Sequence, residues 1–255
     1  KFDHPDYQSA MRLKTIQASA IKSLFEVLKD VLNDVNFVFE PKGVSVLTLD
    51  TARVALIDLY LDSDNFEEYE CHAKISVGVN ISNMYKLLKS INNNDTLTIE
   101  VTSSDIMVIN IENVEKKTKT RFELKQLDIN DDQIVLPDII TNIVTPIPSV
   151  DLQRICRDMN NIASMITFRR SGENLKISCE GDFVNQETVI QCDNTEHSAH
   201  GTFSLRYLNI FTKATAMCST VQILQEEQNR FIIFRYSVAN LGNLNFYLAS
   251  KTDEE

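Results

Sequence analysis

The sequence predicts an α+β protein of two similar domains, each with a few short helices on one face of antiparallel sheets. Two observations support this fold class. Strand-like segments outnumber helical ones, and the order of helices and strands repeats after 131 residues. A chain of 255 residues with 43% hydrophobic and 24% charged content can bury one large core or two smaller ones. The repeat favours two.

The predicted strands are short segments rich in β-branched residues, bounded by turn formers or charges. Most of them alternate between apolar and polar residues, as expected for antiparallel sheets with one face in water. They are residues 43–50, 53–61, 96–101, 105–112, 174–181, 219–226 and 231–238.

Four other segments carry the 3.6-residue period of an amphipathic helix. The first and third have the same apolar spacing, and each runs into strands through a turn that contains Gly43 or Gly172. This similarity supports two like domains, although amphipathic helices can also resemble each other by chance. The apolar positions are Ile21, Leu24, Phe25 and Leu28; Met84, Leu87, Leu88 and Ile91; Leu152, Ile155, Cys156 and Met159; and Leu205, Leu208 and Phe211.

Residues 126–149 lie between the two halves and collect three of the five prolines beside a run of acids. Such a composition predicts an extended connector. We therefore expect an N-terminal extension (1–10), an N-terminal domain (11–125), an interdomain connector (126–143) and a C-terminal domain with an acidic tail (144–255).

Composition also bears on the class of protein. No window approaches the roughly 18 uninterrupted apolar residues of a membrane span, and the first ten residues lack the apolar core of a signal peptide.

The five cysteines are odd in number and widely spread, which predicts free thiols in a reducing compartment. A zinc site at Cys192, His197 and His200 is disfavoured because the spacing is irregular and a fourth ligand is not evident. We expect no metal and no cofactor, since the sequence has neither a phosphate-binding glycine loop nor a serine elbow.

Charge is divided unevenly between the helices and the rest of the chain. The windows 21–32, 81–91, 152–162 and 205–215 hold eight basic and three acidic residues, so they carry +5 while the remainder carries -16. This division favours a surface that neutralises phosphates without reading bases, with an acidic exterior that repels nucleic acid elsewhere. The alternative explanation is structural, since lysine and arginine are common on the solvent-exposed side of any amphipathic helix. The cations, three or seven positions apart in each window, are Lys22, Lys29, Lys86, Lys89, Arg154, Arg157, Arg206 and Lys213.

Six long motifs stand in order along the chain: "IQASAIKSLFEVLKDVLN" (16–33), "GVSVLTLDTARVAL" (43–56), "VGVNISNMYKLLK" (77–89), "RICRDMNNI" (154–162), "LRYLNIFTKAT" (205–215) and "VANLGNLNFYLASK" (238–251). Through these motifs, residues 11–251 resemble the proliferating cell nuclear antigen family of DNA sliding clamps. The resemblance implies the DNA clamp fold and a ring-forming homotrimer, without enzymatic activity, whose helices line a hole for double-stranded DNA. It also implies a nuclear location, or a cytoplasmic replication site for a virus.

The resemblance further assigns candidate site residues. The eight helical cations fall at DNA-facing or helix-borne positions, and Lys125 matches another basic one. Ser23 and Asn161 stand where relatives often carry Lys and His, and Arg170 is assigned to the position of a modifiable lysine.

The family's partners imply a second site. DNA polymerase, the clamp loader and other proteins dock short PIP-box peptides in a hydrophobic pocket beside the connector. Phe231 and Arg53 replace a usual proline and histidine, and Ser250 replaces a proline, which predicts a reshaped pocket. The matching positions are Leu49, Arg53, Val54, Leu56, Ile134, Leu136, Pro137, Phe231, Tyr247 and Ala249.

Ring closure is expected between edge strands of neighbouring subunits, around 119–125 on one and 187–192 on the next, because head-to-tail pairing removes exposed edges. The resemblance assigns Phe122, Thr188 and Ile190 to this junction. Two alternatives stay open: a subunit of a heterotrimeric clamp, which would share the motifs, and a nucleic-acid enzyme that uses Asp and Glu to bind metals.

Overall fold

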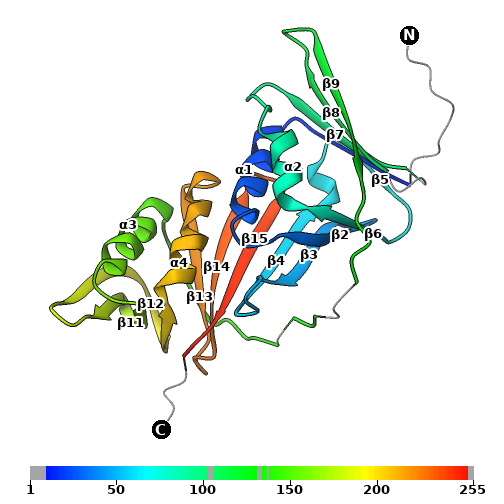
Figure 1. The fold of residues 1–255 in the computed structure, drawn as a ribbon. Coiled ribbons are helices and arrows are strands. Elements are labelled where there is room, and N and C mark those ends of the chain that lie inside the picture. Colours follow the sequence, from blue (N-terminus) through cyan, green and yellow to red (C-terminus); the bar gives the residue numbers. More distant parts are fainter. Residues whose placement is uncertain (1–9, 103–105, 131–133, 137, 252–255) are drawn as a thin grey trace. The chain divides into compact units, whose positions relative to one another are not determined.

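The structure is a computed structural model that describes residues 10–102, 106–130, 134–136 and 138–251. These residues form two compact units, and neither unit is a continuous piece of chain. Unit 1 contains residues 10–46, 59–130 and 238–243, and unit 2 contains the rest. The division passes through four strands, β3 (Gly43–Leu49), β4 (Ala55–Asp62), β14 (Phe231–Val238) and β15 (Gly242–Ala249), so each unit takes part of each of them. Figure 1 labels these strands.

Unit 1 is built on antiparallel sheets. Its five-stranded sheet has the order β5-β1-β7-β8-β9, and its other strands follow the order β4-β3-β2-β6. The elements are β1 Met11–Thr15, α1 Ala18–Leu28, β2 Asp34–Glu40, β3 Gly43–Leu49, β4 Ala55–Asp62, the 3-10 helix η1 Ser63–Asn65, β5 Glu68–Cys71, β6 Ile75–Asn80, α2 Ile81–Leu88, β7 Thr96–Val101, β8 Ile106–Asn113 and β9 Thr118–Lys125.

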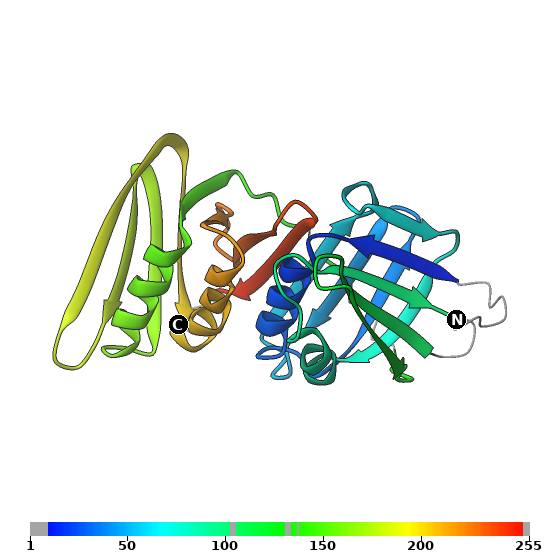
Figure 2. The same ribbon diagram turned by 90° about the horizontal axis from the view of Figure 1, so that it is seen from above.

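The two helices of unit 1 lie side by side, as Figures 1 and 2 both show. Each buries one apolar face, which fits the helical period of its sequence. The Asn80 side chain starts α2 by accepting a hydrogen bond from the Asn83 amide at 2.8 Å. Phe25 of α1 stacks on Phe37 of β2, with ring centroids 5.5 Å apart.

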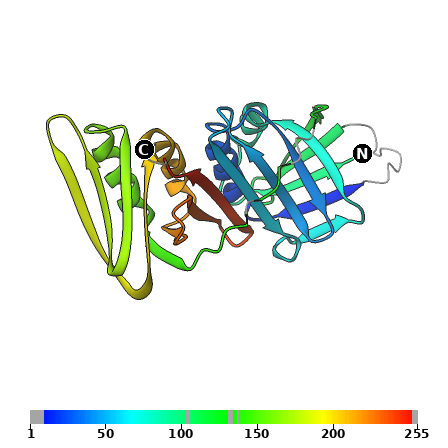
Figure 3. The same cartoon turned by 90° about the horizontal axis from the view of Figure 1, so that it is seen from below.

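Unit 2 combines an antiparallel sheet, of order β10-β13-β14-β15 and then the first half of β4, with a long hairpin of β11 and β12 (Figure 3). Its core is aromatic, with the rings of Phe211 and Phe246 stacked at 4.5 Å. The elements are β10 Ile143–Pro148, α3 Ser149–Asn160, β11 Met165–Glu180, β12 Asn185–Ser204, α4 Leu205–Phe211, the 3-10 helix η2 Thr212–Ala216, β13 Thr220–Gln225, β14 Phe231–Val238 and β15 Gly242–Ala249.

The fold class and all four helices predicted from the sequence are confirmed, with shifts at the ends. The last helix is shorter than its window, because the α-helix ends at Phe211 and Lys213 lies in the 3-10 helix η2. Strand β4 begins at Ala55 rather than at residue 53, because the Asp50 carboxylate accepts backbone hydrogen bonds from Ala52, Val54 and Ala55 and holds a turn there. Residues 1–9 and 252–255, residue 105 of one expected strand, and Pro137 lie outside the described residues.

The start of the connector is attached to unit 1. The Leu127 amide donates to the Gly78 carbonyl at 2.9 Å, and the Asn36 side chain donates to the Ile129 carbonyl at 3.1 Å. A Cβ atom on Gly78 would lie 2.1 Å from the Leu127 carbonyl oxygen, so glycine is required for this approach.

Unit 1 also contains a late segment of the chain, residues 238–243. The Asp62 amide donates to the Leu241 carbonyl at 2.9 Å, and the Asn240 amide donates to the Gln17 side chain at 3.1 Å. Unit 1 therefore depends on residues that the chain supplies near its end.

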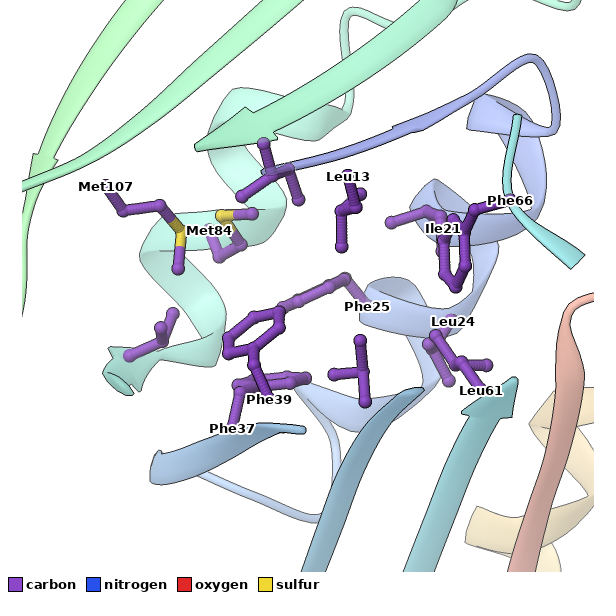
Figure 4. A pocket seen from close by; sticks show the side chains of 13 residues that line it. Leu13, Ile21, Leu24, Phe25, Phe37, Phe39, Leu61, Phe66, Met84 and Met107 are labelled. Atoms are coloured by element: carbon purple, nitrogen blue, oxygen red, sulfur yellow. The ribbon is translucent and has the colours of Figure 1, made fainter. Parts of the chain in front are cut away.

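The core of unit 1 encloses a small apolar cavity of about 40 Å³. Figure 4 shows Phe25, Phe37 and Phe39 gathered along one side of it, with Met84 and Met107 close by. Val79 of β6 also lines the cavity, whereas Val77, two residues earlier on the same face of the strand, does not. The space exceeds the volume of a methyl group, so the packing is incomplete at this point.

We expect Val79→Ile to raise the free energy of unfolding by about 0.5 to 1 kcal/mol, because the added methyl group fills this cavity. Val77→Ile is the matched control, since the same addition at a fully packed position strains the core. Urea titration followed by circular dichroism measures both. Equal effects of the two substitutions would contradict the assignment of free space to the Val79 side.

Candidate nucleic-acid and partner-binding surfaces

The exposure of the cationic side chains in unit 1 follows from the way α1 and α2 bury their apolar faces. With the apolar faces packed inward, Lys86 and Lys89 are exposed, and Lys22 and Lys29 are half-buried. Lys29 and Lys89 are also the C-cap residues of their helices, where a positive charge complements the helix dipole. Lys125, the remaining candidate in this unit, is exposed at the end of β9 rather than on a helix.

Three of these lysines have near neighbours. The Lys22 ammonium donates to the Ile91 carbonyl at 2.7 Å, which ties α1 to the segment after α2. The Lys29 ammonium lies 4.9 Å from the centroid of the Tyr85 ring, and Lys86 donates to the Asn83 side chain at 3.2 Å. Burial, with a contribution from Glu26, raises the pKa of Tyr85, so the ring that faces Lys29 stays neutral. Lys22 and Lys29 therefore have structural contacts of their own.

The cations of unit 2 lie on α3, α4 and η2. Arg154, Arg157, Arg206 and Lys213 are all exposed, and the Gln153 side chain links α3 to η2 by donating to the Thr212 carbonyl at 3.0 Å. The contact of Arg154 with Asp151 is long, at 3.6 Å, and exposed, so it restrains the guanidinium only weakly.

The structure thus gathers four predicted cations on the helices of each unit. Lysine and arginine at the ends of long side chains neutralise phosphate groups and release counterions, but they carry no base sequence information when they contact only the backbone. These surfaces can hold a polyanion without sequence readout.

Four predicted pocket residues come together in unit 2. Leu56 and Tyr247 are buried in one apolar cluster, and Leu49 and Ile134 pack against its edge. Burial, followed by the nearby Asp58 carboxylate, raises the pKa of Tyr247, so its phenol is neutral near pH 7. Sequence reasoning missed other members of the cluster. Alternation within strands predicts burial of Leu47, Leu224 and Ile233 but does not show that they lie beside the pocket, and Ile139 lies in the connector outside any strand.

The other pocket candidates lie at the surface of unit 2. Val54 is 45% exposed and Leu136 is 41% exposed, while Ala249 is also exposed and Phe231 is half-buried. Arg53 is exposed in the turn closed by Asp50 and has a left-handed backbone with a φ of 59°. Ile134 packs against the cluster, yet its neighbour Val135 is 84% exposed, so the apolar run of the connector is only partly covered.

The two strands expected to close a ring are both edges in the described chain. β9 is the outer strand of its sheet, and β12 pairs with β11 alone. Phe122, Thr188 and Ile190 are half-buried, and Val189, between the last two, is 52% exposed. Both strands therefore present backbone groups and partly exposed side chains that another chain can cover.

Arg170, which stands where the resemblance places a modifiable lysine, is an interior residue. A modifiable position requires an accessible side chain, but Arg170 is only 3% exposed. Its guanidinium donates to the Thr145 hydroxyl and to the backbone carbonyls of Gly172, Asn174 and Asp193. This residue is an interior structural arginine, and no modification is expected at this position.

The described residues also bear on thiol, metal and membrane chemistry. All five cysteines are free thiols, as predicted. Within the ranges that the structure describes, His, Cys, Asp and Glu side chains form no group of three or more that could hold a metal ion. In the same ranges, none of the helices has both the length and the apolar character needed to span a membrane.

Comparisons with known proteins cover both units. The family model described as "Proliferating cell nuclear antigen, N-terminal domain" matches residues 10–133, and that described as "Proliferating cell nuclear antigen, C-terminal domain" matches residues 135–251. A relative named "Probable DNA polymerase sliding clamp 1", from Paramecium bursaria Chlorella virus 1, is 36% identical over 252 residues, covering 93% of this chain and 95% of the relative. The chain therefore belongs to the proliferating cell nuclear antigen family.

Proposed function

We propose that this chain is a DNA sliding clamp, a protein without enzymatic activity that encircles duplex DNA and keeps a DNA polymerase on its template. The observation that carries the proposal is the match of both family domains over nearly the whole chain, joined to a relative named as a polymerase sliding clamp. The exposed cations on the helices of each unit support it, because they suit a sequence-independent phosphate contact. Its place of action is a site of DNA replication, either the nucleus or a viral site in the cytoplasm.

The assembly we propose is a closed homotrimer, with β9 of one subunit paired to the 187–192 part of β12 in the next. Both strands have an unpaired edge in the described chain, and unpaired edges favour association with another chain. Phe122 supplies an apolar side chain at this junction. A heterotrimeric clamp remains the second candidate, since it would use the same edges with different partners.

Replacing Phe122 with Ala is expected to shift the protein from trimers toward monomers, because the junction loses most of an aromatic side chain. Light scattering over a dilution series measures the mass against the 29.1 kDa of one chain. Val114→Ala, which shortens an exposed apolar side chain in the turn before β9 and outside the 119–125 segment, is the control and should leave the mass unchanged. A wild-type protein that stays monomeric at high micromolar concentration contradicts the homotrimer and favours the heterotrimeric alternative.

We propose that DNA contacts are weak and topological, made by the cations of α1, α2, α3, α4 and η2 and by Lys125. A ring around a hydrated duplex makes few direct phosphate contacts at one time, and water mediates others. Affinity for linear DNA is then low and falls steeply with salt.

Lys86→Glu is expected to reduce stimulation of the replicative polymerase several-fold while leaving thermal stability nearly unchanged, because Lys86 is exposed. Lys42→Glu makes the same charge change at an exposed turn outside the helices and serves as the control. A primer-extension assay on a circular template loaded with the clamp measures processivity. Two variants with equal losses would point to net charge alone, and tight sequence-dependent binding of linear DNA would contradict a topological clamp.

We propose that the apolar cluster of Leu56 and Tyr247, with Leu49 and Ile134 at its edge, forms the floor of a pocket for PIP-box peptides from polymerase, clamp loader and other partners. Exposed Leu136 and Val54 then supply its rim. An exposed apolar rim beside a buried aromatic residue suits a short helical peptide with aromatic anchors. Acidic residues of the connector favour peptides with basic flanks.

A labelled PIP-box peptide is expected to bind in the micromolar range, and Leu136→Ser should weaken it by about 1 to 3 kcal/mol, roughly five-fold to a hundred-fold in Kd. Val135→Ser is the matched control, because Val135 is the next residue but is not assigned to the pocket. Tyr247→Ala tests the floor, with its fold checked by circular dichroism. Fluorescence anisotropy measures each Kd, and equal affinity for wild type and Leu136→Ser would remove the pocket assignment.

A further inference from the structure

Arg170 occupies a special place in the β11–β12 hairpin. Its Nε donates to the Thr145 hydroxyl of β10 at 3.2 Å, and Nη1 donates to the carbonyl of Asn174 at 3.4 Å and to that of Gly172. Nη2 donates to the carbonyl of Asp193 in β12. One buried guanidinium therefore joins β10 and both strands of the hairpin.

These contacts lie where the hairpin loses its regular pairing. Arg170 pairs with Ala199, but Asn174 pairs with Gln191. An advance of four residues along β11 therefore corresponds to eight residues along β12. Between them Gly172 has a left-handed backbone with a φ of 54°. The extra residues of β12 interrupt the ladder, and carbonyls beside the irregularity need another donor.

The guanidinium suits this need. It is planar and presents five donors, which can reach several carbonyls at fixed angles, whereas a lysine ammonium is a single point charge. Its contacts in the described structure are all neutral oxygens, so its role there is to satisfy backbone groups rather than to form an ion pair. Burial of a charged side chain at this point is costly unless its hydrogen bonds are made, which makes the arrangement specific.

Beyond the irregularity lies the tip half of the hairpin, defined here as residues 174–180 paired with 185–191. Leu175, Ile177 and Cys179 bury one face of it. The same half carries residues 187–191 of the 187–192 segment that the proposed function assigns to ring closure. The direction of this segment is set where the tip half leaves the regular ladder, at the contacts of Arg170.

We propose that Arg170 is a positioning residue for ring closure: it fixes the angle of the tip half and so aligns the edge of β12 with β9 of the next subunit. This inference rests on the proposed homotrimer. It predicts that loss of the guanidinium weakens assembly more than it weakens the fold of the subunit.

The test compares three variants by analytical ultracentrifugation over a dilution series. Arg170→Met keeps an unbranched apolar side chain but removes the hydrogen-bond donors. It should raise the concentration at which half of the chains are trimeric by at least about tenfold, because the backbone carbonyls at the irregularity lose their donor. Arg170→Lys keeps the positive charge but lacks the planar set of guanidinium donors. Its half-trimer concentration should lie between those of Arg170→Met and wild type. Arg169→Met removes a neighbouring but exposed arginine and should assemble as wild type does.

Hydrogen exchange on the dilute monomer separates positioning from loss of fold. In Arg170→Met, amides of the tip half should exchange faster while those of α3 keep wild-type protection. Loss of protection across α3 as well, assembly of Arg170→Met at the wild-type concentration, or an equal shift in Arg169→Met would each overturn the inference while leaving the homotrimer intact. A wild-type chain that never forms trimers overturns the proposed homotrimer and, with it, the link from Arg170 to assembly.

Discussion

The four helices each have one apolar stripe that must leave water, and this requirement decides which way their cations point. Leu24, Met84, Leu152 and Leu208 are almost fully buried, so the opposite sides of their helices face outward. Acidic residues concentrate on strands, loops and connector, which leaves the outward helical sides basic. The same burial that stabilises each unit therefore creates its phosphate-compatible surface, and no ligand is needed to form it.

The candidate pocket couples binding to stability in a similar way. Leu56 and Tyr247 belong to the core of unit 2, and the Asp50 carboxylate fixes the turn that carries Arg53 and Val54. A partner that docks here would contact an extension of the core rather than a separate loop. Substitutions in the floor of the pocket should therefore lower the stability of the fold, whereas substitutions in the rim should mainly lower the affinity for the partner.

Sequence patterns identified the helices because a 3.6-residue apolar period is a strong signal, over about three turns in α1 and α3 and about two turns in α2 and α4. Strands β1, β2, β5, β6, β10 and β15 were not predicted. For β1 and β5 the reason is their length, since five or four residues give little alternation to detect. Only the second part of β11 was predicted, because Arg170 resembles a surface residue in sequence although its charge is solvated by backbone carbonyls in the interior. The helical cations were found by counting charge. The pocket required the family resemblance, because periodicity shows which residues are buried but not which strands bring them together.

The sharing of residues between the two units has a consequence for biosynthesis. Unit 1 includes residues 238–243, whose Leu241 carbonyl accepts the Asp62 amide, and unit 2 includes residues 47–58. A ribosome that has released the first 130 residues has therefore not released all of unit 1, although those residues include both of its helices. Native contacts across such sequence distances form slowly. During synthesis, unit 1 therefore cannot complete its native contacts until residues 238–243 have emerged, after most of unit 2.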